Sequence, residues 1–304
     1  MTNPNPNPGR AYNCEAKFFK AATKEHAATL SKKAMKSTFK LLAKHAEKGR
    51  WGNLTPQNIT QKQLTKYVQQ RLDDGLKSRT IKNQVAHIRR AIKLCGREEF
   101  NSSFSNKDLG VPESTYIGKG KATDPAVLEL ALERATPIET AWIVAMNELG
   151  MRGRELVRAG PSLQQWERQI TAGQPIYLYA GAKTGRSRQV YIAPERREAA
   201  LEAVRTLKDI AERQGGHVVA KDSLAQAISH VAYRLARLGL VGENSPHSLR
   251  RDFAVKQRAH YRSQGFSEIE SRCRVSVDLG HGDSLQRGTV AYNSYIRSTE
   301  ESRA

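Results

Sequence analysis

The sequence has few cysteines, no long apolar run and a shortage of acidic residues. Its three cysteines, Cys14, Cys95 and Cys273, lie far apart and form neither a disulfide framework nor a Cys-x-x-Cys metal pair. No apolar stretch approaches the roughly 20 residues that a membrane-spanning helix needs, and no segment resembles a signal peptide. We therefore expect no membrane partner, no metal, and a reducing, cytoplasmic environment.

Acidic residues are outnumbered, since 50 Lys and Arg stand against 30 Asp and Glu, a formal net charge of +20. Like charges repel one another in a folded protein, so an excess of this size is usually retained for a polyanionic partner. Such an excess suits nucleic acid first and an anionic membrane surface second, and the lack of a membrane-spanning segment or signal peptide favours nucleic acid. At 304 residues the chain has room for two domains, each with its own core.

Composition and periodicity divide the chain into segments. Residues 1–13 are rich in Pro and Asn, which predicts a disordered tail. Residues 14–108 have helical periodicity. Residues 109–123 contain three glycines, a proline and two lysines with little periodicity, which is typical of a linker. Residues 124–304 form the second predicted domain.

The second domain is predicted to be mainly helical with one small antiparallel sheet. Asp124 and Pro125 are a good N-cap and first-turn pair for a helix that runs through Ala135. Further helices are expected over 138–149, where Gly150 stops the helix, over 195–213 and 223–238, and after Pro246. The β-rich alternation of 176–194 predicts a hairpin with its turn near Gly185.

Two predicted helices in 14–108 carry rows of cations. In 78–94 the apolar face is formed by Ile81, Val85, Ile88 and Ile92. About a quarter turn from that face, a stripe is formed by Lys82, Arg89 and Lys93. The earlier helix carries a stripe formed by Lys33, Lys36, Lys40 and Lys44. Such helices suit a DNA groove, although a solvated charged face explains each of them taken singly.

Four separated segments carry residues suited to phosphate chemistry: GMRGREL (150–156), AKTGRSRQVYI (182–192), PHSLRRDFA (246–254) and LGHGDSLQRGTVAYNSY (279–295). Each alone is explained by an ordinary helix end, exposed turn or core tyrosine. In this order, however, they resemble the catalytic domain of tyrosine recombinases and phage integrases. The resemblance covers about residues 122–297, and 15–108 resembles the helical core-binding domain that precedes it in that family.

The resemblance implies a role for each matching residue. The catalytic candidates are Arg152, Lys183, His247, Arg250, His281 and Tyr292, and the supporting acid is Glu155. Two arginines would bind the phosphate oxygens, the tyrosine would attack phosphorus, and the lysine would protonate the departing oxygen. His247 would accept the tyrosine proton or hold the phosphate, and His281 would donate a hydrogen bond to it. The DNA-contact candidates are Lys33, Lys36, Lys40, Lys82, Arg89 and Lys93.

The last motif departs from the family pattern. From His281 to Tyr292 is eleven residues, two more than the usual spacing in the family. Residues 262–272 look like an insertion, and Ser294 stands where the family has a histidine. Tyr295 lies within one helical turn of Tyr292 and stays open as the alternative nucleophile.

The implied activity is site-specific recombination, in which DNA strands are cut and rejoined through a 3′-phosphotyrosyl intermediate without a cofactor. The implied partners are double-stranded DNA with core sites, a homotetramer of this chain, and accessory DNA-bending proteins. We expect a bacterial or phage-encoded protein without a separate arm-binding domain before Cys14. Two alternatives stay open: a type IB topoisomerase that relaxes DNA, and a non-catalytic DNA-binding relative.

Overall fold

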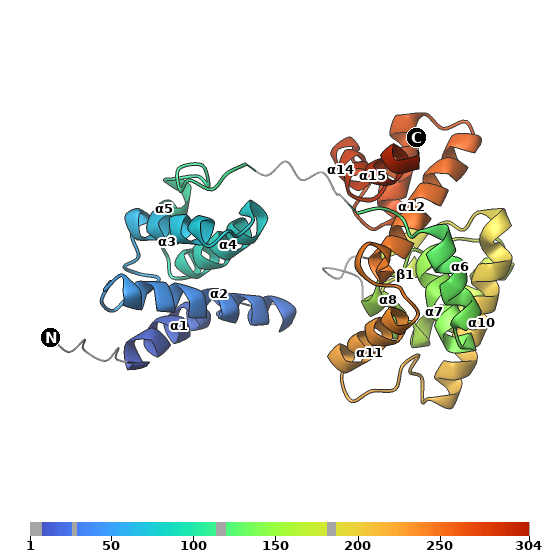
Figure 1. Cartoon of the computed structure of the whole chain (residues 1–304), viewed down its shortest axis with the longest axis horizontal. Helices are drawn as coiled ribbons and strands as arrows, with labels where there is room; N and C mark the ends of the chain where they lie inside the picture. The colour runs from blue at the N-terminus through green and yellow to red at the C-terminus, as the bar shows by residue number, and fades with distance from the viewer. Residues whose placement is uncertain (1–7, 26–28, 114–119, 181–186, 304) are drawn as a thin grey trace. The chain divides into compact units, whose positions relative to one another are not determined.

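The computed structural model describes residues 8–25, 29–113, 120–180 and 187–303. The chain divides into two units, residues 1–115 and 116–304, coloured blue to teal and green to red in Figure 1. The division falls within 109–123, the segment predicted to be a linker. The start of that segment packs in the first unit, and its end is bonded in the second. Leu109 and Val111 are buried in the core of the first unit. In the second, the main-chain N–H of Ala122 donates to Thr299 Oγ1 at 2.7 Å.

The first unit is helical in its described part. Its helices are α1 (Pro8–Ala22), α2 (Thr29–Lys48), α3 (Gln61–Asp73), α4 (Ser78–Leu94) and α5 (Glu98–Ser102). The apolar face predicted for 78–94 is confirmed, because Ile81, Val85, Ile88 and Ile92 are all buried. Together with residues such as Phe18 and Phe39 they form one apolar core.

Helix α1 corrects the expectation of a disordered tail over 1–13. The helix begins at Pro8, and residues 1–7 lie outside the described part of the chain. A proline is compatible with the first turn of a helix because it needs no hydrogen-bonded N–H there. Farther along α1, Cys14, Phe18 and Ala22 are buried in the core of the unit, which stabilises the helix.

The second unit is mainly helical with a small antiparallel sheet, as predicted. Its helices are α6 (Pro125–Arg134), α7 (Pro137–Glu148), α8 (Gly153–Val157), α9 (Leu163–Thr171), α10 (Arg197–Arg213), α11 (Leu224–Arg237), α12 (Pro246–Ser263), α13 (Glu268–Asp278), α14 (Leu285–Tyr295) and α15 (Arg297–Arg303). Short 3₁₀ helices span Gly160–Ser162, Pro194–Arg196 and Gly242–Asn244. Strand β1 (Ile176–Leu178) pairs with β2 (Arg188–Val190) so that Leu178 lies opposite Arg188. The turn near Gly185 lies outside the described residues.

Local sequence signals set the ends of α6 and α7. The Asp124 side chain caps α6 by accepting the Ala126 N–H at 2.9 Å. Thr136 and Glu139 form a capping box at the start of α7. Gly150 follows this helix with φ +58°, and a Cβ there would come within 2.4 Å of the ring of Phe253. Only glycine therefore fits at this turn, which leads directly into Arg152 and α8.

Helix α7 lies in the core of the second unit, in contact with α10, α11 and α12. Its buried residues include Trp142 and Met146, and they share one apolar cluster with Trp166, Val204 and Phe253. The cluster reaches the end of α7 and the first turns of α12, so the elements that bear Arg152 and Arg250 are held by packing. No described helix combines the length and the apolar character that crossing a membrane requires.

Candidate active site

A buried carboxylate lies at the centre of the motifs. Glu155 is fully buried in α8, and it accepts the main-chain N–H of Arg152 at 2.8 Å. Its side-chain oxygens lie 2.6 Å from Arg152 Nη1 and 2.8 Å from Arg188 Nη2. Arg250 Nη1 is 4.0 Å from the same carboxylate. Three guanidinium groups thus surround one carboxylate, which leaves an excess of positive charge.

Main-chain carbonyl groups hold two of these arginines in place. Arg250 is 1% exposed and donates to the carbonyls of Gly150 and Leu279, the latter at 2.6 Å. Arg152 donates to the same Leu279 carbonyl at 3.1 Å, and its Nη2 is 3.5 Å from His281 Nε2. The side chain of Arg152 is 22% exposed. Guanidinium forks held in this way are suited to binding the oxygens of an anion.

The charges of the arginines keep Glu155 ionised. Burial alone would raise its pKa, but Arg188, Arg250 and Arg152 together lower the pKa of Glu155 to about 2. Burial, followed by the charges of Arg188 and Arg152, lowers the pKa of Arg250 to about 9. At neutral pH the Glu155 carboxylate is therefore negative and the Arg250 guanidinium is positive.

Two histidines and a tyrosine lie next to the arginines. His247 is in the first turn of α12, and His281 follows α13, where its main-chain N–H donates to the Ser276 carbonyl at 2.8 Å. The ring of Tyr295, in the last turn of α14, has its centroid 5.4 Å from that of each imidazole. Arg250 Cζ lies 5.7 Å from the same centroid. The arginines, the histidines and this phenol form one cluster.

His247 is neutral at neutral pH although the residue is solvent-accessible. Partial loss of hydration is the largest cause, followed by the charges of Arg251, Arg250 and Arg152, and together they lower the pKa of His247 to about 4. A neutral imidazole beside a phenol can accept its proton.

Tyr292 points toward Glu300 and not into this cluster. Its hydroxyl donates to Glu300 Oε2 at 3.1 Å, and the guanidinium carbon of Arg272 lies 3.7 Å from the centroid of its ring. Burial, and then Glu300, raises the pKa of Tyr292. Of the residues expected at the site, the structure brings together Arg152, Glu155, His247, Arg250 and His281, with Tyr295 beside them.

Residues 113–256 match a family model described as Integrase. The match spans the positions of Arg152, Glu155, His247 and Arg250, which the fold gathers into one cluster. This segment of the chain is identified as a member of the tyrosine recombinase and phage integrase family.

The fold of this chain is similar to solved structures over most of its length. The Tn1549 transposon integrase in complex with a circular intermediate DNA is 13% identical, with a TM-score of 0.60 over 94% of this chain and 97% of that chain. A lambda integrase dimer bound to a COC′ core site is 17% identical, with a TM-score of 0.58 over 94% and 96%. A comparison with curated proteins finds no match. At these identities the likeness concerns the fold.

Arg188 is a part of the candidate site for which the sequence predicted no role. It is 4% exposed on β2 and donates to the carbonyls of Asp278 and Gly150 as well as to Glu155. Two signals point to it. Arg188 lies in the motif segment AKTGRSRQVYI, and it shares the inward face of β2 with Val190. A cation on the inward face of a strand requires a buried partner.

The remaining candidates are Lys183 and the cations of the first unit. Lys183 lies outside the described residues. On α2, the side chains of Lys33, Lys36 and Lys40 are exposed. Within the described ranges, no three His, Cys, Asp or Glu side chains are grouped so as to hold a metal ion.

The stripe predicted on α4 is partly engaged within the first unit. Arg89 is half-buried, donates to the Phe104 carbonyl at 2.9 Å and lies with Cζ 5.0 Å from the centroid of the Phe104 ring. Lys93 Nζ is 2.5 Å from Glu98 Oε1, and Lys82 is half-buried. Arg89 therefore supports the core of its unit, whereas the lysines of α2 face solvent.

Proposed function

We propose that this recombinase cleaves and rejoins double-stranded DNA at specific core sites through a 3′-phosphotyrosyl intermediate. One arrangement carries the proposal: the ring of Tyr295 lies 5.4 Å from both His247 and His281 and beside the buried Arg250. Two structures of the same fold contain DNA, and a net charge of +20 favours a polyanionic partner.

Each residue of the cluster has a task in this transesterification. Arg152 and Arg250 bind the non-bridging oxygens of the scissile phosphate and stabilise the negative charge that develops on them. The tyrosine oxygen bonds to phosphorus as the bond to the 5′ oxygen breaks. His247, which is neutral, accepts the phenolic proton, and His281 donates a hydrogen bond to the phosphate. Lys183, which lies between β1 and β2 in the sequence, protonates the departing 5′ oxygen.

Rejoining is the same reaction in reverse. A 5′ hydroxyl attacks the phosphotyrosyl bond, the tyrosine oxygen departs, and the proton returns to the phenol. One phosphodiester is exchanged for one phosphotyrosyl ester at each step, so the bond energy is conserved and no nucleoside triphosphate is needed.

We favour Tyr295 as the nucleophile. The resemblance to the family implies Tyr292 for this role. The Tyr292 hydroxyl donates a hydrogen bond to Glu300, whereas the Tyr295 ring lies next to both histidines. Two residues three positions apart on a helix differ by about 60° in direction and about 4.5 Å in height. A nucleophile must lie in line with the departing oxygen, so both tyrosines cannot serve in one geometry.

A nicked suicide substrate tests the proposal, because the cleaved strand cannot be rejoined and the adduct accumulates. The DNA that flanks the gene supplies candidate core sites. Tyr295→Phe should abolish the adduct, while Tyr292→Phe should still form one, and peptide mapping identifies the modified tyrosine. An adduct on Tyr292 would reverse the assignment of the nucleophile. Binding of these sites without any adduct would indicate the non-catalytic alternative.

The assembly also belongs to the proposal. We expect a homotetramer on two paired core sites, assisted by accessory DNA-bending proteins, and the layout of the sites would decide between integration, excision, inversion and resolution. Joining of two different DNA molecules distinguishes recombination from topoisomerase activity. A protein that only relaxes supercoiled DNA would contradict this part of the proposal.

A further inference from the structure

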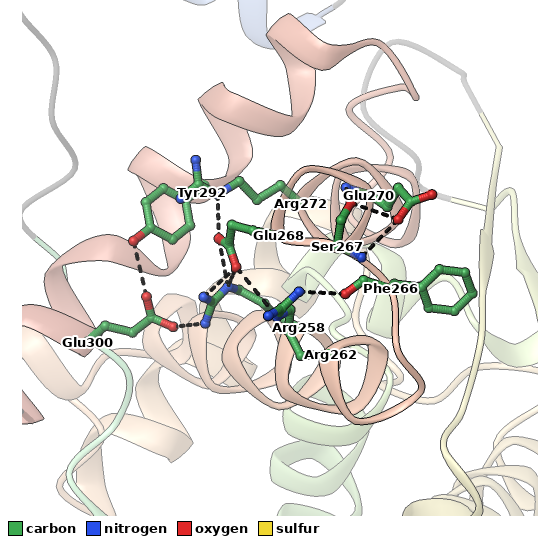
Figure 2. A network of polar contacts seen from close by, with 9 residues as sticks. All are labelled: Arg258, Arg262, Phe266, Ser267, Glu268, Glu270, Arg272, Tyr292 and Glu300. Atoms are coloured by element: carbon green, nitrogen blue, oxygen red, sulfur yellow. Dashed lines mark hydrogen bonds and ion pairs between the residues drawn. The ribbon is translucent and has the colours of Figure 1, made fainter.

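A polar cluster joins four helices of the second unit, α12, α13, α14 and α15 (Figure 2). Its central carboxylate belongs to the segment 262–272, which looks like an insertion in the family pattern. We call it the Glu268 cluster. Its members are Arg258 and Arg262 of α12, Glu268 and Arg272 of α13, Tyr292 of α14 and Glu300 of α15. None of its side chains has a catalytic role in the function proposed above.

Glu268 is the central acceptor of this cluster. Its carboxylate accepts Arg258 Nη2 and Arg272 Nε, each at 2.6 Å, and Arg258 Nε lies 3.1 Å from both of its oxygens. Arg262 Nε is 3.9 Å away. Because Glu268 begins α13, these bonds join the start of α13 to the last turns of α12.

The two arginines that Glu268 holds also contact α14 and α15. Arg272 lies with Cζ 3.7 Å from the centroid of the Tyr292 ring, a favourable cation–π distance. Arg258 donates to Glu300, whose other oxygen accepts the Tyr292 hydroxyl at 3.1 Å. In Figure 2 the dashed lines run from Glu268 through Arg258 and Glu300 to the Tyr292 hydroxyl, and Arg272 is bonded to the same Glu268. Tyr292 is thus held at its ring face and at its hydroxyl.

The same face of α14 approaches α13 closely one turn earlier. A Cβ on Gly288 would lie 3.0 Å from Cys273 Sγ and 3.1 Å from the Cys273 main-chain nitrogen. Gly288, Tyr292 and Tyr295 follow one another at spacings of four and three, so they share one face of the helix. The close approach and the cluster therefore fix the distance and the rotation of α14 just before Tyr295.

We infer that the Glu268 cluster positions the nucleophile. Its contacts with the ring and the hydroxyl of Tyr292 fix the orientation of α14, and Glu268 is a positioning residue. The inference rests on the proposed function, with Tyr295 as the attacking group. It explains why two tyrosines lie one turn apart: one orients the helix and the other reacts.

Stability alone is a weak explanation for this cluster. The side chains of Arg258, Glu268, Arg272 and Glu300 are 22–33% exposed. Ion pairs that remain in contact with solvent contribute little to folding free energy. Orientation of a nucleophile is far more sensitive, since a displacement of about 1 Å can lower a rate by about 100-fold.

Glu268→Gln tests the inference against a matched control. The substitution keeps the size of the side chain and removes its charge. The control is Glu270→Gln, which removes the same charge from the same helix at a carboxylate bonded only to Ser267 within the described part of the chain. The measurements are the single-turnover rate of covalent attachment to the suicide substrate and the concentration of DNA that half-saturates it.

Glu268→Gln should lower the attachment rate about 10- to 100-fold and leave the half-saturating DNA concentration within about twofold. Glu270→Gln should match the unmodified protein in both. Glu300→Gln, at the other end of the chain of contacts, should lower the rate in the same sense, and the double variant should be no slower than the slower single variant. If the cluster had only a structural role, the losses in attachment rate of the two single variants would add in the double variant. These losses would also parallel the decrease in melting temperature.

Attachment by Glu268→Gln at the unmodified rate would overturn the inference while leaving the proposed function intact. If Glu268→Gln is unfolded at the assay temperature, Glu300→Gln decides, and an unmodified rate there overturns the inference equally. If the unmodified protein forms no adduct, the proposed function fails before the variants are compared.

Discussion

At the scale of single residues, the site depends on the shape of the guanidinium group as much as on its charge. Arg250 reaches two carbonyls at once, those of Gly150 and Leu279, and lies beside Glu155. A lysine keeps the charge but has no planar fork to bind a phosphate in two places.

Arg250→Lys should therefore lower the rate of covalent attachment about 10²- to 10³-fold, the loss typical of a transition-state donor. DNA affinity should change little, because one cation remains in place. Single-turnover cleavage and a binding isotherm measured on the same substrate separate the two effects. Attachment within a fewfold of the unmodified rate would remove Arg250 from the proposed role.

The pH dependence tests whether His247 acts as the base. A base works in its neutral form, which is present above its pKa. Because the pKa of His247 is lowered to about 4, activity should persist from pH 7 to pH 5 and be lost only as the pH falls through about 4. The attachment rate at subsaturating DNA reports the free protein. A loss centred on pH 6.5, the ordinary histidine value, would contradict the assignment.

The sequence predicted which arginines and histidines lie together better than which tyrosine lies beside them. Arg152, His247 and Arg250 sit in short motifs at helix starts, where local spacing decides the geometry. The position of a tyrosine on α14 depends on where that helix begins, after the Ser284 cap, and on which face meets α13 at Gly288. Both depend on tertiary packing, so the spacing of the motif in the sequence, which is two residues longer than usual, could not predict them. Arg188 was missed because its partners come from distant segments.

At the scale of elements, helix ends were predictable wherever the signal was local. Pro125 and Pro137 open helices, and Gly150 closes one. Helix α1 was missed because Pro and Asn around its start favour disorder, while its stability comes from burying Phe18 and Ala22 in the unit's core.

The contact of α14 with α13 gives a prediction of its own. Gly288→Ala adds a methyl group 3.0 Å from Cys273 Sγ, so the helices must separate or strain. We expect a loss of stability of about 1–3 kcal/mol and a slower attachment rate. Thermal unfolding and single-turnover cleavage measure the two. Gln286→Ala, at an exposed position on the same helix, is the control and should change neither. Equal behaviour of both variants would show that the spacing is not critical.

At the scale of the whole molecule, positive charge is spread over both units, and only part of it is free to meet DNA. Lys33, Lys36 and Lys40 are exposed on α2, whereas Arg89 is engaged with Phe104. The sequence could place both stripes on helices, but it could not show which cations make contacts within their own unit.

The triple variant Lys33→Ala, Lys36→Ala and Lys40→Ala should weaken binding to all DNA sequences and reduce the salt slope by about three, or about one per phosphate contact. Arg89→Ala should lower the melting temperature and leave the slope nearly unchanged. Affinity measured across a salt series decides. An unaltered slope in the triple variant would show that this face of α2 does not touch DNA.

The nearness of Tyr295 to Arg250 has a consequence for how DNA enters. Arg250 is 1% exposed, and the phenol ring is one of the groups that lie over its guanidinium. Tyr295 is itself only 8% exposed. Under the proposed function, its hydroxyl reaches a phosphate held by the arginines only after the side chain turns outward. Entry of the substrate and exposure of the nucleophile would then be one coupled movement, and a tyrosine without a phosphate to attack would stay covered.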